Sequence, residues 1–274
     1  SSDVCSSDLP TAAPAAATAS GFSQGPITGF GSVIVNGVRW DDSSASVSDD
    51  DGVAHGSDVL KLGMVVEVEG EHGAAGAHAS SIRFASETLG PVDSIDAAAS
   101  TFVVMGLTVQ VNASTVFDAS ISNGLAGLAP ADVVEVYGLF DAASRSVLAT
   151  RIEKRTGVTE YRLRGTVSAL NTGVQTFQLG SQTISYASAS GVPATLADGV
   201  QVKVRVQTAP VGGAWVANRV RVIVREALAD HGEAEVEGVI SAWTSATQFS
   251  IDGLPVDASA ATFPDGDAGV VLGA

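Results

Sequence analysis

The chain lacks the residues that stabilise or anchor several common classes of protein. Its 274 residues include a single cysteine, Cys5. One thiol per chain excludes an intramolecular disulfide framework and a cysteine-based zinc site. No apolar run approaches the roughly 18 residues of a membrane-spanning helix. Aromatic residues make up only 5% of the sequence, so its apolar content lies elsewhere.

Basic residues are also scarce. Lys and Arg number 14 against 30 Asp and Glu, which gives a formal net charge of −16. Nucleic acids and anionic membrane surfaces attract proteins through clustered positive charge. The sequence therefore predicts no nucleic-acid partner.

Small and β-branched apolar residues are what the chain has in abundance. Hydrophobic residues make up 45% of it, mostly Val, Ala, Leu and Ile, and there are 30 glycines. This composition favours small β-rich modules over helical bundles.

The beginning of the chain, 1–22, differs from the rest. Residues 1–9, "SSDVCSSDL", resemble the translation of a sequencing adapter, so we expect them not to belong to the natural protein and a signal sequence to have been lost with the true N-terminus. The following segment is rich in Ala, Pro, Ser and Thr and is predicted to be a disordered linker. Such tethers are common in exported, envelope-anchored bacterial proteins, which predicts an exported, periplasmic or outer-membrane lipoprotein-like location.

Four signatures recur in a fixed order along the remaining chain. The first is a glycine that opens an apolar-polar alternation, at Gly25, Gly90, Gly165 and Gly238, which follow one another at similar intervals. The second is a glycine between two apolar stretches, at Gly37, Gly106, Gly180 and Gly253. The third is the alternation in "GMVVEVEG", "DVVEVYG" and "GVQVKVRV", and the fourth is "ASSIRF", "ATRIEK" and "ANRVRV". The fourth copy ends before its third signature, so we expect it to be truncated.

These signatures predict an all-β fold of tandem small OB-like β-barrels, each of roughly five strands in about 70 residues. The valines of the third signature share one face of a strand, because side chains alternate with a period of two. The predicted modules are 23–87, 88–158, 159–229 and the truncated 230–274. Two-residue hairpin turns are expected at Asn36–Gly37 and Asp252–Gly253, and weaker ones at Met105–Gly106 and Leu179–Gly180.

At these residues the sequence resembles the bacterial domain-of-unknown-function 5666 family. The resemblance lies in "GPITGFGSVIVNGVRWDD", "LKLGMVVEVEG" and "ASSIRF" and covers roughly residues 23–274. It implies tandem β-barrels in exported or lipoprotein-like envelope proteins. The family has no catalytic residues that can be transferred to this chain.

Histidines and aspartates give two candidate metal sites. His72 and His78 flank a predicted hairpin loop and, with Glu69 or Glu71, could hold a divalent metal. We favour exposed loop histidines there; the other two histidines of the chain are His55 and His231. A second cluster suits Ca²⁺ by its oxygen ligands, although a solvated acidic loop is the preferred interpretation. It comprises Asp41, Asp42, Asp49, Asp50 and Asp51, with a fainter version at Asp265 and Asp267.

Two further sets of residues are candidates for binding. The third module carries outward-facing basic residues at Arg162, Arg164, Lys203, Arg205, Arg219, Arg221 and Arg225. The preferred interpretation is that they keep strand edges soluble, and the alternative is that an acidic neighbouring module or partner docks on them. Trp40, Trp215 and Trp243 are expected to cap barrel cores, and the alternative is stacking on a sugar ring.

No pattern for catalysis is present in the sequence. It has no usable cysteine nucleophile and no glycine-rich phosphate loop, and its one Gly-x-Ser-x-Gly match, Gly21 to Gly25, leads into a predicted strand and not into the helix that a nucleophile elbow needs. We therefore predict that the chain is not an enzyme, and we assign no catalytic, cofactor-binding or metal residues. The expected function is a non-catalytic structural or binding array of the bacterial cell envelope, with an unknown protein or glycan as partner. The alternative is a carbohydrate- or Ca-binding accessory module.

Overall fold

The computed structural model describes residues 19–73, 76–141, 144–223, 233–251, 254–264 and 266–271. Strands account for nearly all regular structure in these ranges, and only two short 3₁₀ turns occur there, η1 (Ser57–Val59) and η2 (Gly124–Gly127). Within the described part of the chain, no helix has the length and apolar character needed to cross a membrane.

The first barrel closes through five strands. They are β1 (Ala19–Gly29), β2 (Val33–Val35), β3 (Val38–Asp41), β6 (Val65–Gly73) and β7 (Gly76–Phe84). Around the barrel the order is β1-β2-β3-β7-β6 and back to β1, with β3 and β7 parallel and the other pairs antiparallel. Two short strands, β4 (Ser46–Asp49) and β5 (Ala54–His55), extend the sheet beside β7.

The second and third barrels repeat this plan. Barrel 2 contains β8 (Thr88–Asp96), β9 (Thr101–Val104), β10 (Leu107–Gln110), β12 (Val133–Asp141) and β13 (Ser146–Lys154), with β11 (Val116–Phe117) beside β13. Barrel 3 contains β14 (Glu160–Asn171), β15 (Thr176–Leu179), β16 (Gln182–Ser185), β17 (Gln201–Gln207) and β18 (Trp215–Val222). In both, the first strand pairs with the second and the fourth, and the third and fifth run parallel. The predicted tandem OB-like barrels are confirmed.

The alternating valines form the barrel interiors, as predicted. Val66 and Val68 in β6, Val134 and Val136 in β12, and Val202 and Val204 in β17 are all buried. Burying a valine side chain contributes about 1.5–3 kcal/mol relative to leaving it exposed, so these positions hold the fourth strand of each barrel in register.

The hairpin turns agree with the prediction at two places and differ at one. Asn36 and Gly37 have φ of 52° and 80°, and Met105 and Gly106 have 48° and 79°, as a type I′ turn requires. In barrel 3 the register pairs Leu179 with Gln182, so the turn is Gly180–Ser181 rather than Leu179–Gly180. The shift arises because Leu179 is buried as the last residue of β15. The predicted turn at Asp252–Gly253 lies outside the described residues.

Strand β1 begins before the predicted linker ends. Ala19 to Phe22 pair with the outer half of β6, although the sequence placed the linker at residues 1–22. The long β6 pairs with these residues, which the Ala-, Pro-, Ser- and Thr-rich composition of the segment had assigned to the linker. The adapter-like residues 1–9 lie outside the described ranges.

Within the described residues, the start of the fourth module does not form a separate barrel. Its first strand, β19 (Glu233–Val236), lies parallel to β1 of barrel 1, with Gly21 opposite Glu233. The strands β20 (Ile240–Ser245), β21 (Gln248–Ile251) and β22 (Leu254–Asp257) form a separate three-stranded sheet.

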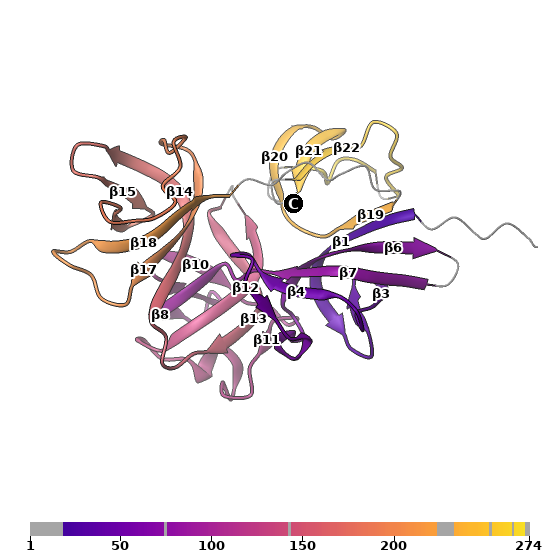
Figure 1. Cartoon of the computed structure of the whole chain (residues 1–274), viewed down its shortest axis with the longest axis horizontal. Helices are drawn as coiled ribbons and strands as arrows, with labels where there is room; N and C mark the ends of the chain where they lie inside the picture. Colours follow the sequence, from indigo (N-terminus) through magenta and orange to yellow (C-terminus); the bar gives the residue numbers. More distant parts are fainter. Residues whose placement is uncertain are drawn as a thin grey trace, which may run out of the picture.

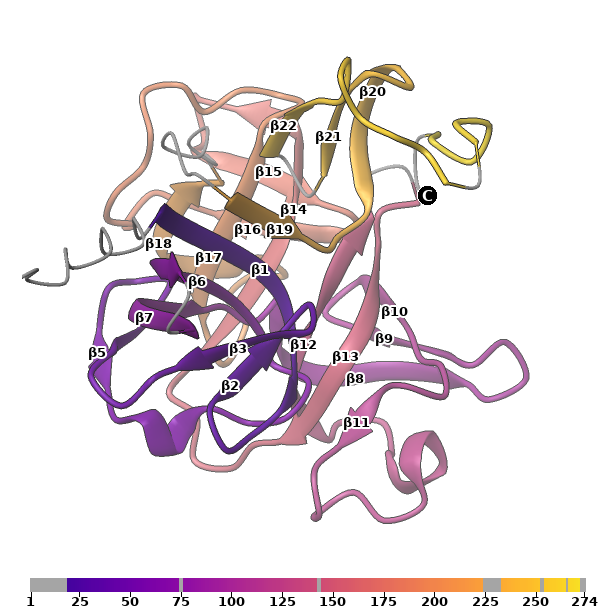
Figure 2. The same cartoon turned by 90° about the vertical axis from the view of Figure 1, so that its right-hand side faces the viewer.

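The barrels meet around a common centre (Figures 1 and 2). Barrel 1 has its own apolar core, which also receives Tyr137 from β12 of barrel 2. Barrels 2 and 3 share one continuous core, and Leu89 of β8 pairs with Arg162 of β14. The sequence predicted the barrels but not the shared core of barrels 2 and 3. Alternation of apolar residues indicates that a side chain is buried, but it does not indicate which module packs against it.

Candidate functional site

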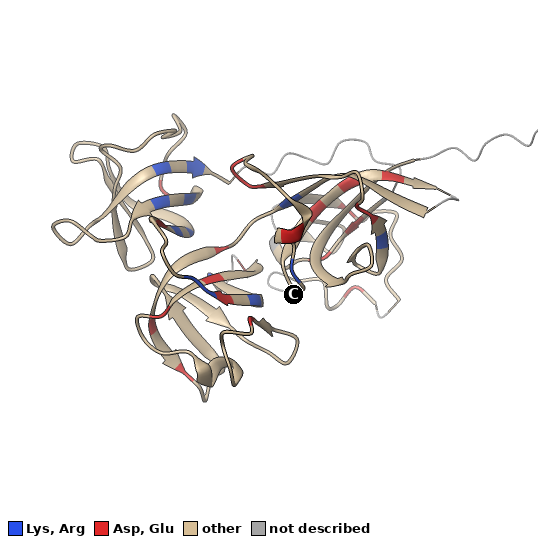
Figure 3. Ribbon diagram, turned by 60° about the horizontal axis from the view of Figure 1, so that its bottom comes forward, with Lys and Arg blue, Asp and Glu red and all other residues tan. Residues whose placement is uncertain are grey.

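Six basic side chains form a regular array on the outer face of barrel 3. In the register of β14, β17 and β18 they make two rows, Arg162, Arg205 and Arg219 in one and Arg164, Lys203 and Arg221 in the other. Residues paired across strands project to the same face, and so do residues two apart in one strand. We call these six residues the basic grid; its strands carry the blue segments at one side of Figure 3. Like charges directly opposite one another are destabilising, so the grid requires anions.

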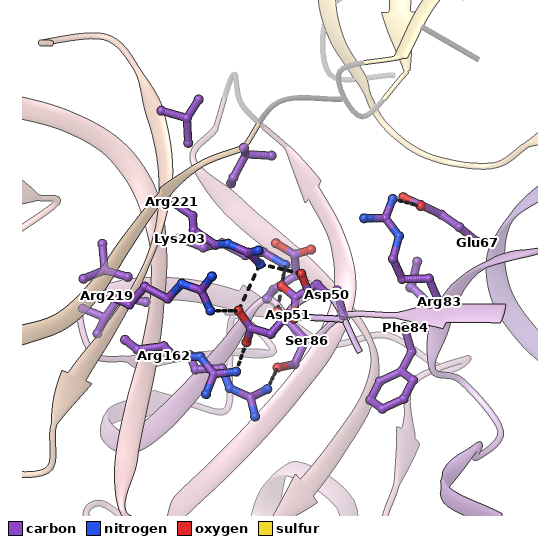
Figure 4. A pocket seen from close by; sticks show the side chains of 18 of the residues that line it. Asp50, Asp51, Glu67, Arg83, Phe84, Ser86, Arg162, Lys203, Arg219 and Arg221 are labelled. Carbon is purple, nitrogen blue, oxygen red and sulfur yellow. Dashed lines mark hydrogen bonds and ion pairs between the residues drawn. The ribbon is translucent and has the colours of Figure 1, made fainter. Parts of the chain in front are cut away.

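Barrel 1 supplies two of these anions through the loop between β4 and β5. Asp51 pairs with three cations of the grid: with Arg205, with Arg219 at 3.2 Å and with Arg221 at 3.0 Å (Figure 4). Asp50 pairs with Lys203 at 3.1 Å, and its main-chain carbonyl accepts a hydrogen bond of 2.7 Å from Arg221. The Asp51 side chain is only 10% exposed. Residues 49–52 are called the acidic loop below.

The acidic loop is held in shape by its own first residue. The Asp49 carboxylate accepts hydrogen bonds from the backbone amides of Asp51 and Val53, at 3.0 and 2.9 Å. It also lies 3.3 Å from Nε2 of His55. A side chain that caps its own turn in this way fixes the loop, which presents Asp50 and Asp51 to the grid.

Barrel 2 and its leading segment supply two more anions. Glu135 in β12 lies 2.9 Å from Nη1 of Arg162, which also donates to the Ser86 hydroxyl at 3.0 Å. Glu87 pairs with Arg164, and both side chains are buried. The Arg164 guanidinium lies 4.3 Å from the centre of the Phe140 ring. Buried ion pairs of this kind hold their partners in a fixed geometry because separating them would leave a charge without a counterion.

Barrels 1 and 2 also meet directly. Arg151 donates a 3.0 Å hydrogen bond to the carbonyl oxygen of Leu62. A side chain at the neighbouring Gly63 would place its Cβ 2.5 Å from the carbonyl oxygen of Thr150, and Gly63 has a positive φ of 83°. Burial in the core of barrel 1, together with the charges of Glu135 and Glu153, raises the pKa of the Tyr137 hydroxyl far above its usual value, so it stays neutral.

A cleft of about 490 Å³ opens between barrels 1 and 3, beside the acidic loop. Five residues of the grid line it: Arg162, Lys203, Arg205, Arg219 and Arg221. Barrel 1 contributes Glu67 and Arg83, which pair with each other, and Phe84. The opposite walls of the cleft therefore come from two modules that are far apart in sequence.

The preferred prediction for the basic residues of the third module is wrong. They do not serve mainly as solvated edge charges, because six of them pair with carboxylates. The alternative, an electrostatic surface for a neighbouring module, is what the structure contains. Arg225 lies outside the described residues.

The aspartates of the predicted acidic cluster divide into two groups. Oxygens of Asp49, Asp50 and Asp51 lie within 4.8 Å of one another, but the last two already face four cations. Asp41 is elsewhere: its carboxylate accepts a hydrogen bond from the Ser43 amide, which lowers its pKa, and lies 3.4 Å from His78. A solvated loop is thus also wrong for Asp50 and Asp51. Of the fainter pair, Asp265 is outside the described residues.

The two histidines of the predicted hairpin do not converge. In the register of β6 and β7, His72 lies opposite Ala77 and His78 lies opposite Glu71. Since His78 follows Ala77 directly, the two imidazoles project to opposite faces of the ribbon. His72 stands beside the Trp40 ring, with centroids 6.5 Å apart. His231 lies outside the described residues.

The three tryptophans have different environments. Trp40 is buried and donates a hydrogen bond to the Ser23 hydroxyl, so the expected core cap is confirmed there. Trp215 donates to Gln182 and packs edge-on against Tyr161, at the margin of the core of barrels 2 and 3. Trp243 is 46% exposed.

Several residues of the junction were missed in the sequence. Glu135 and Tyr137 occupy outward-facing positions of β12 and are nevertheless buried. An outward-facing tyrosine in a strand was the available signal, because a large aromatic side chain on that face has to be covered by something. Ser86 and Glu87, between the first two modules, gave no signal.

The family model of a domain of unknown function, DUF5666, matches the chain three times, at residues 24–83, 90–153 and 164–221. These matches cover most of the three barrels, and the chain belongs to this family. A solved structure described as drosophila Unr CSD456 aligns with 61% of this chain and 79% of its own, at 13% identity and a TM-score of 0.21. The chain has no significant match among curated proteins.

Proposed function

We propose that the chain is a non-catalytic structural array of the bacterial cell envelope, in which three barrels act as one body. The observation that carries this proposal is the basic grid, which receives carboxylates from both other barrels. If barrel 3 moved freely on a linker, the six like charges of the basic grid would repel one another without fixed anions opposite them. The envelope location rests on the composition of the first residues and on the resemblance to exported proteins.

The distribution of charge supports a structural role. Six of the 14 Lys and Arg residues lie in this one grid, although the chain has a net charge of −16. Concentrating scarce cations on one face is costly unless anions are fixed opposite them. Three segments outside barrel 3 provide anions, and each of these contacts constrains the relative position of two barrels; Glu160 of β14 adds one more anion, to Arg205, within barrel 3.

The same contacts support the non-catalytic part of the proposal. A general acid or base needs a shifted pKa and access to a substrate. The carboxylates gathered at the junction instead face basic side chains, which neutralise their charge. Glu87 and Glu135 are also buried, so they act as counterions in this proposal.

The alternative function, a carbohydrate- or Ca-binding accessory module, has less support at the residues that suggested it in the sequence. Trp40 is buried, and Asp50 and Asp51 are already neutralised by basic side chains. Among the tryptophans, the exposed Trp243 offers its ring most openly to a sugar.

Small-angle X-ray scattering of the whole chain tests the proposal. Replacing Asp50→Asn and Asp51→Asn together removes both anions of the acidic loop. We expect the radius of gyration to rise at about 0.1 M salt, because barrel 1 turns away from the grid while Tyr137 still holds it to barrel 2.

The matched control is Asp42→Asn with Asp58→Asn, which removes two charges from barrel 1 away from the grid. It should leave the scattering curve unchanged. An unchanged curve for the loop variant as well would show that the acidic loop does not hold barrel 1 against the grid. An extended natural chain would overturn the proposal of one body itself.

A further inference from the structure

We propose that the cleft between barrels 1 and 3 binds a small polyhydroxylated anion, such as a sugar acid or sugar phosphate, through its carboxylate or phosphate group. This inference goes beyond the structural role but rests on it, because the cleft has two walls only while barrel 1 is docked. The ligand class follows from three features: hydrogen-bond donors that remain open, the size of the cleft, and its charge.

The first feature is the guanidinium of Arg162. Its Nη1 atom donates to Ser86 and Glu135, but its Nε atom is buried without a hydrogen-bond partner among the described residues. A buried N–H group without an acceptor has lost its hydration without compensation, so an incoming acceptor is favoured there. The Nε and Nη2 edge of a guanidinium is a planar fork that matches the two oxygens of a carboxylate or phosphate. A small change of rotamer, common on binding, would present this edge to an anion in the cleft.

The second set of open donors belongs to Arg219 and Arg221. In the described part of the chain both contact Asp51 through Nη1, and Arg221 also donates to the Asp50 carbonyl. Each guanidinium has five N–H donors, so these contacts leave most of them for a ligand. Their side chains are 39% and 41% exposed and line the cleft (Figure 4). An incoming anion would meet these two residues first.

The size and charge of the cleft restrict the rest of the ligand. A volume of about 490 Å³ lies within the roughly 300–1,000 Å³ of small-molecule sites and suits a molecule of one or two sugar rings. Six cationic and four anionic residues line it. The cations favour an anion, and the carboxylates of Asp50 and Glu67 can accept hydrogen bonds from its hydroxyl groups. A purely apolar ligand would leave these groups unpaired.

The test is calorimetric titration of the whole chain with three related ligands. Glucuronate carries a carboxylate, glucose 6-phosphate carries a phosphate, and glucose carries neither. We expect at least one of the two anions to bind at least tenfold more tightly than glucose, and the tighter one identifies the group. Equal affinities for all three, or binding of none, would overturn the proposal.

A conservative variant locates the site. Arg162→Lys keeps the charge that faces Glu135 but removes the planar fork. We expect at least tenfold weaker binding of the preferred anion, and about the same loss for Arg219→Gln. Arg39→Lys, the same change in barrel 1 outside the cleft, should bind like the natural chain. Unchanged binding by Arg162→Lys would show that the anion binds elsewhere.

The scattering curve separates this failure from failure of the structural proposal. If the unliganded chain scatters as one body and no anion binds, only the ligand proposal is wrong. If the chain is extended at about 0.1 M salt, the cleft is absent and the structural proposal has failed first. Each variant's melting temperature shows whether a loss of binding reflects unfolding.

Discussion

Barrel 3 contacts its two neighbours in two different ways. Against barrel 2 it shares a continuous apolar core, a strand pairing and a buried ion pair between Arg164 and Glu87. Against barrel 1 it has the acidic loop, whose ion pairs border an open cleft. The first contact gains from removing apolar surface from water, whereas the second depends on charges that water and salt still reach. The same fold therefore forms one junction that is mainly apolar and one that consists mainly of ion pairs.

The largest effect is expected from removing apolar volume at the first junction. Phe140→Ala deletes a buried ring that carries Arg164 on its face. We expect a loss of about 3–5 kcal/mol in the free energy of unfolding, measured by denaturant titration. Phe30→Ala, at an exposed position of barrel 1, should change it by less than about 0.5 kcal/mol. Equal effects of the two changes would contradict the described core.

A smaller but still large effect is expected from breaking the buried ion pair. Glu87→Gln leaves Arg164 buried without its counterion and should cost about 3 kcal/mol. The double variant Glu87→Leu with Arg164→Met replaces both partners by apolar side chains and should recover most of this loss. Denaturant titrations of the three proteins measure it. If the double variant were as unstable as Glu87→Gln, the ion pair itself would stabilise the junction, and the loss in Glu87→Gln could not be explained by an unpaired buried charge alone.

Raising the salt concentration is expected to change the free energy of unfolding least and the radius of gyration most. Raising the salt concentration from about 0.1 to 1 M shortens the screening length from about 10 to 3 Å. We expect the radius of gyration to increase as barrel 1 leaves the grid, while the contact between barrels 2 and 3 persists. Hydrogen exchange should then increase at the acidic loop and at β17–β18, and not at β8 and β14. Uniform protection at both salt concentrations would remove the distinction between the junctions.

The repeats made the barrels predictable from sequence, whereas the contacts between barrels were not. Val66 and Val68 alternate with charged residues, and alternation with a period of two is a local signal. Arg221 in β18 is separated from its partner Asp51 by 170 positions of the chain, and no local pattern connects them. Glu135 illustrates this limit. The alternation in β12 correctly predicted that its side chain points away from the interior of barrel 2, but the neighbouring barrels bury it in the junction.

The sequence by itself determined the all-β class, the number of barrels, the strands that carry the valines and the turns at Asn36–Gly37 and Met105–Gly106. These depend on side-chain alternation and on backbone angles, which neighbouring residues set. Only the tertiary structure decided that Tyr137 enters the core of barrel 1, that β19 joins β1 and that scarce cations face carboxylates of other modules. Those outcomes depend on which surfaces of the barrels meet. The free energy of burying a charge or an aromatic ring depends on neighbouring residues that are distant in the sequence.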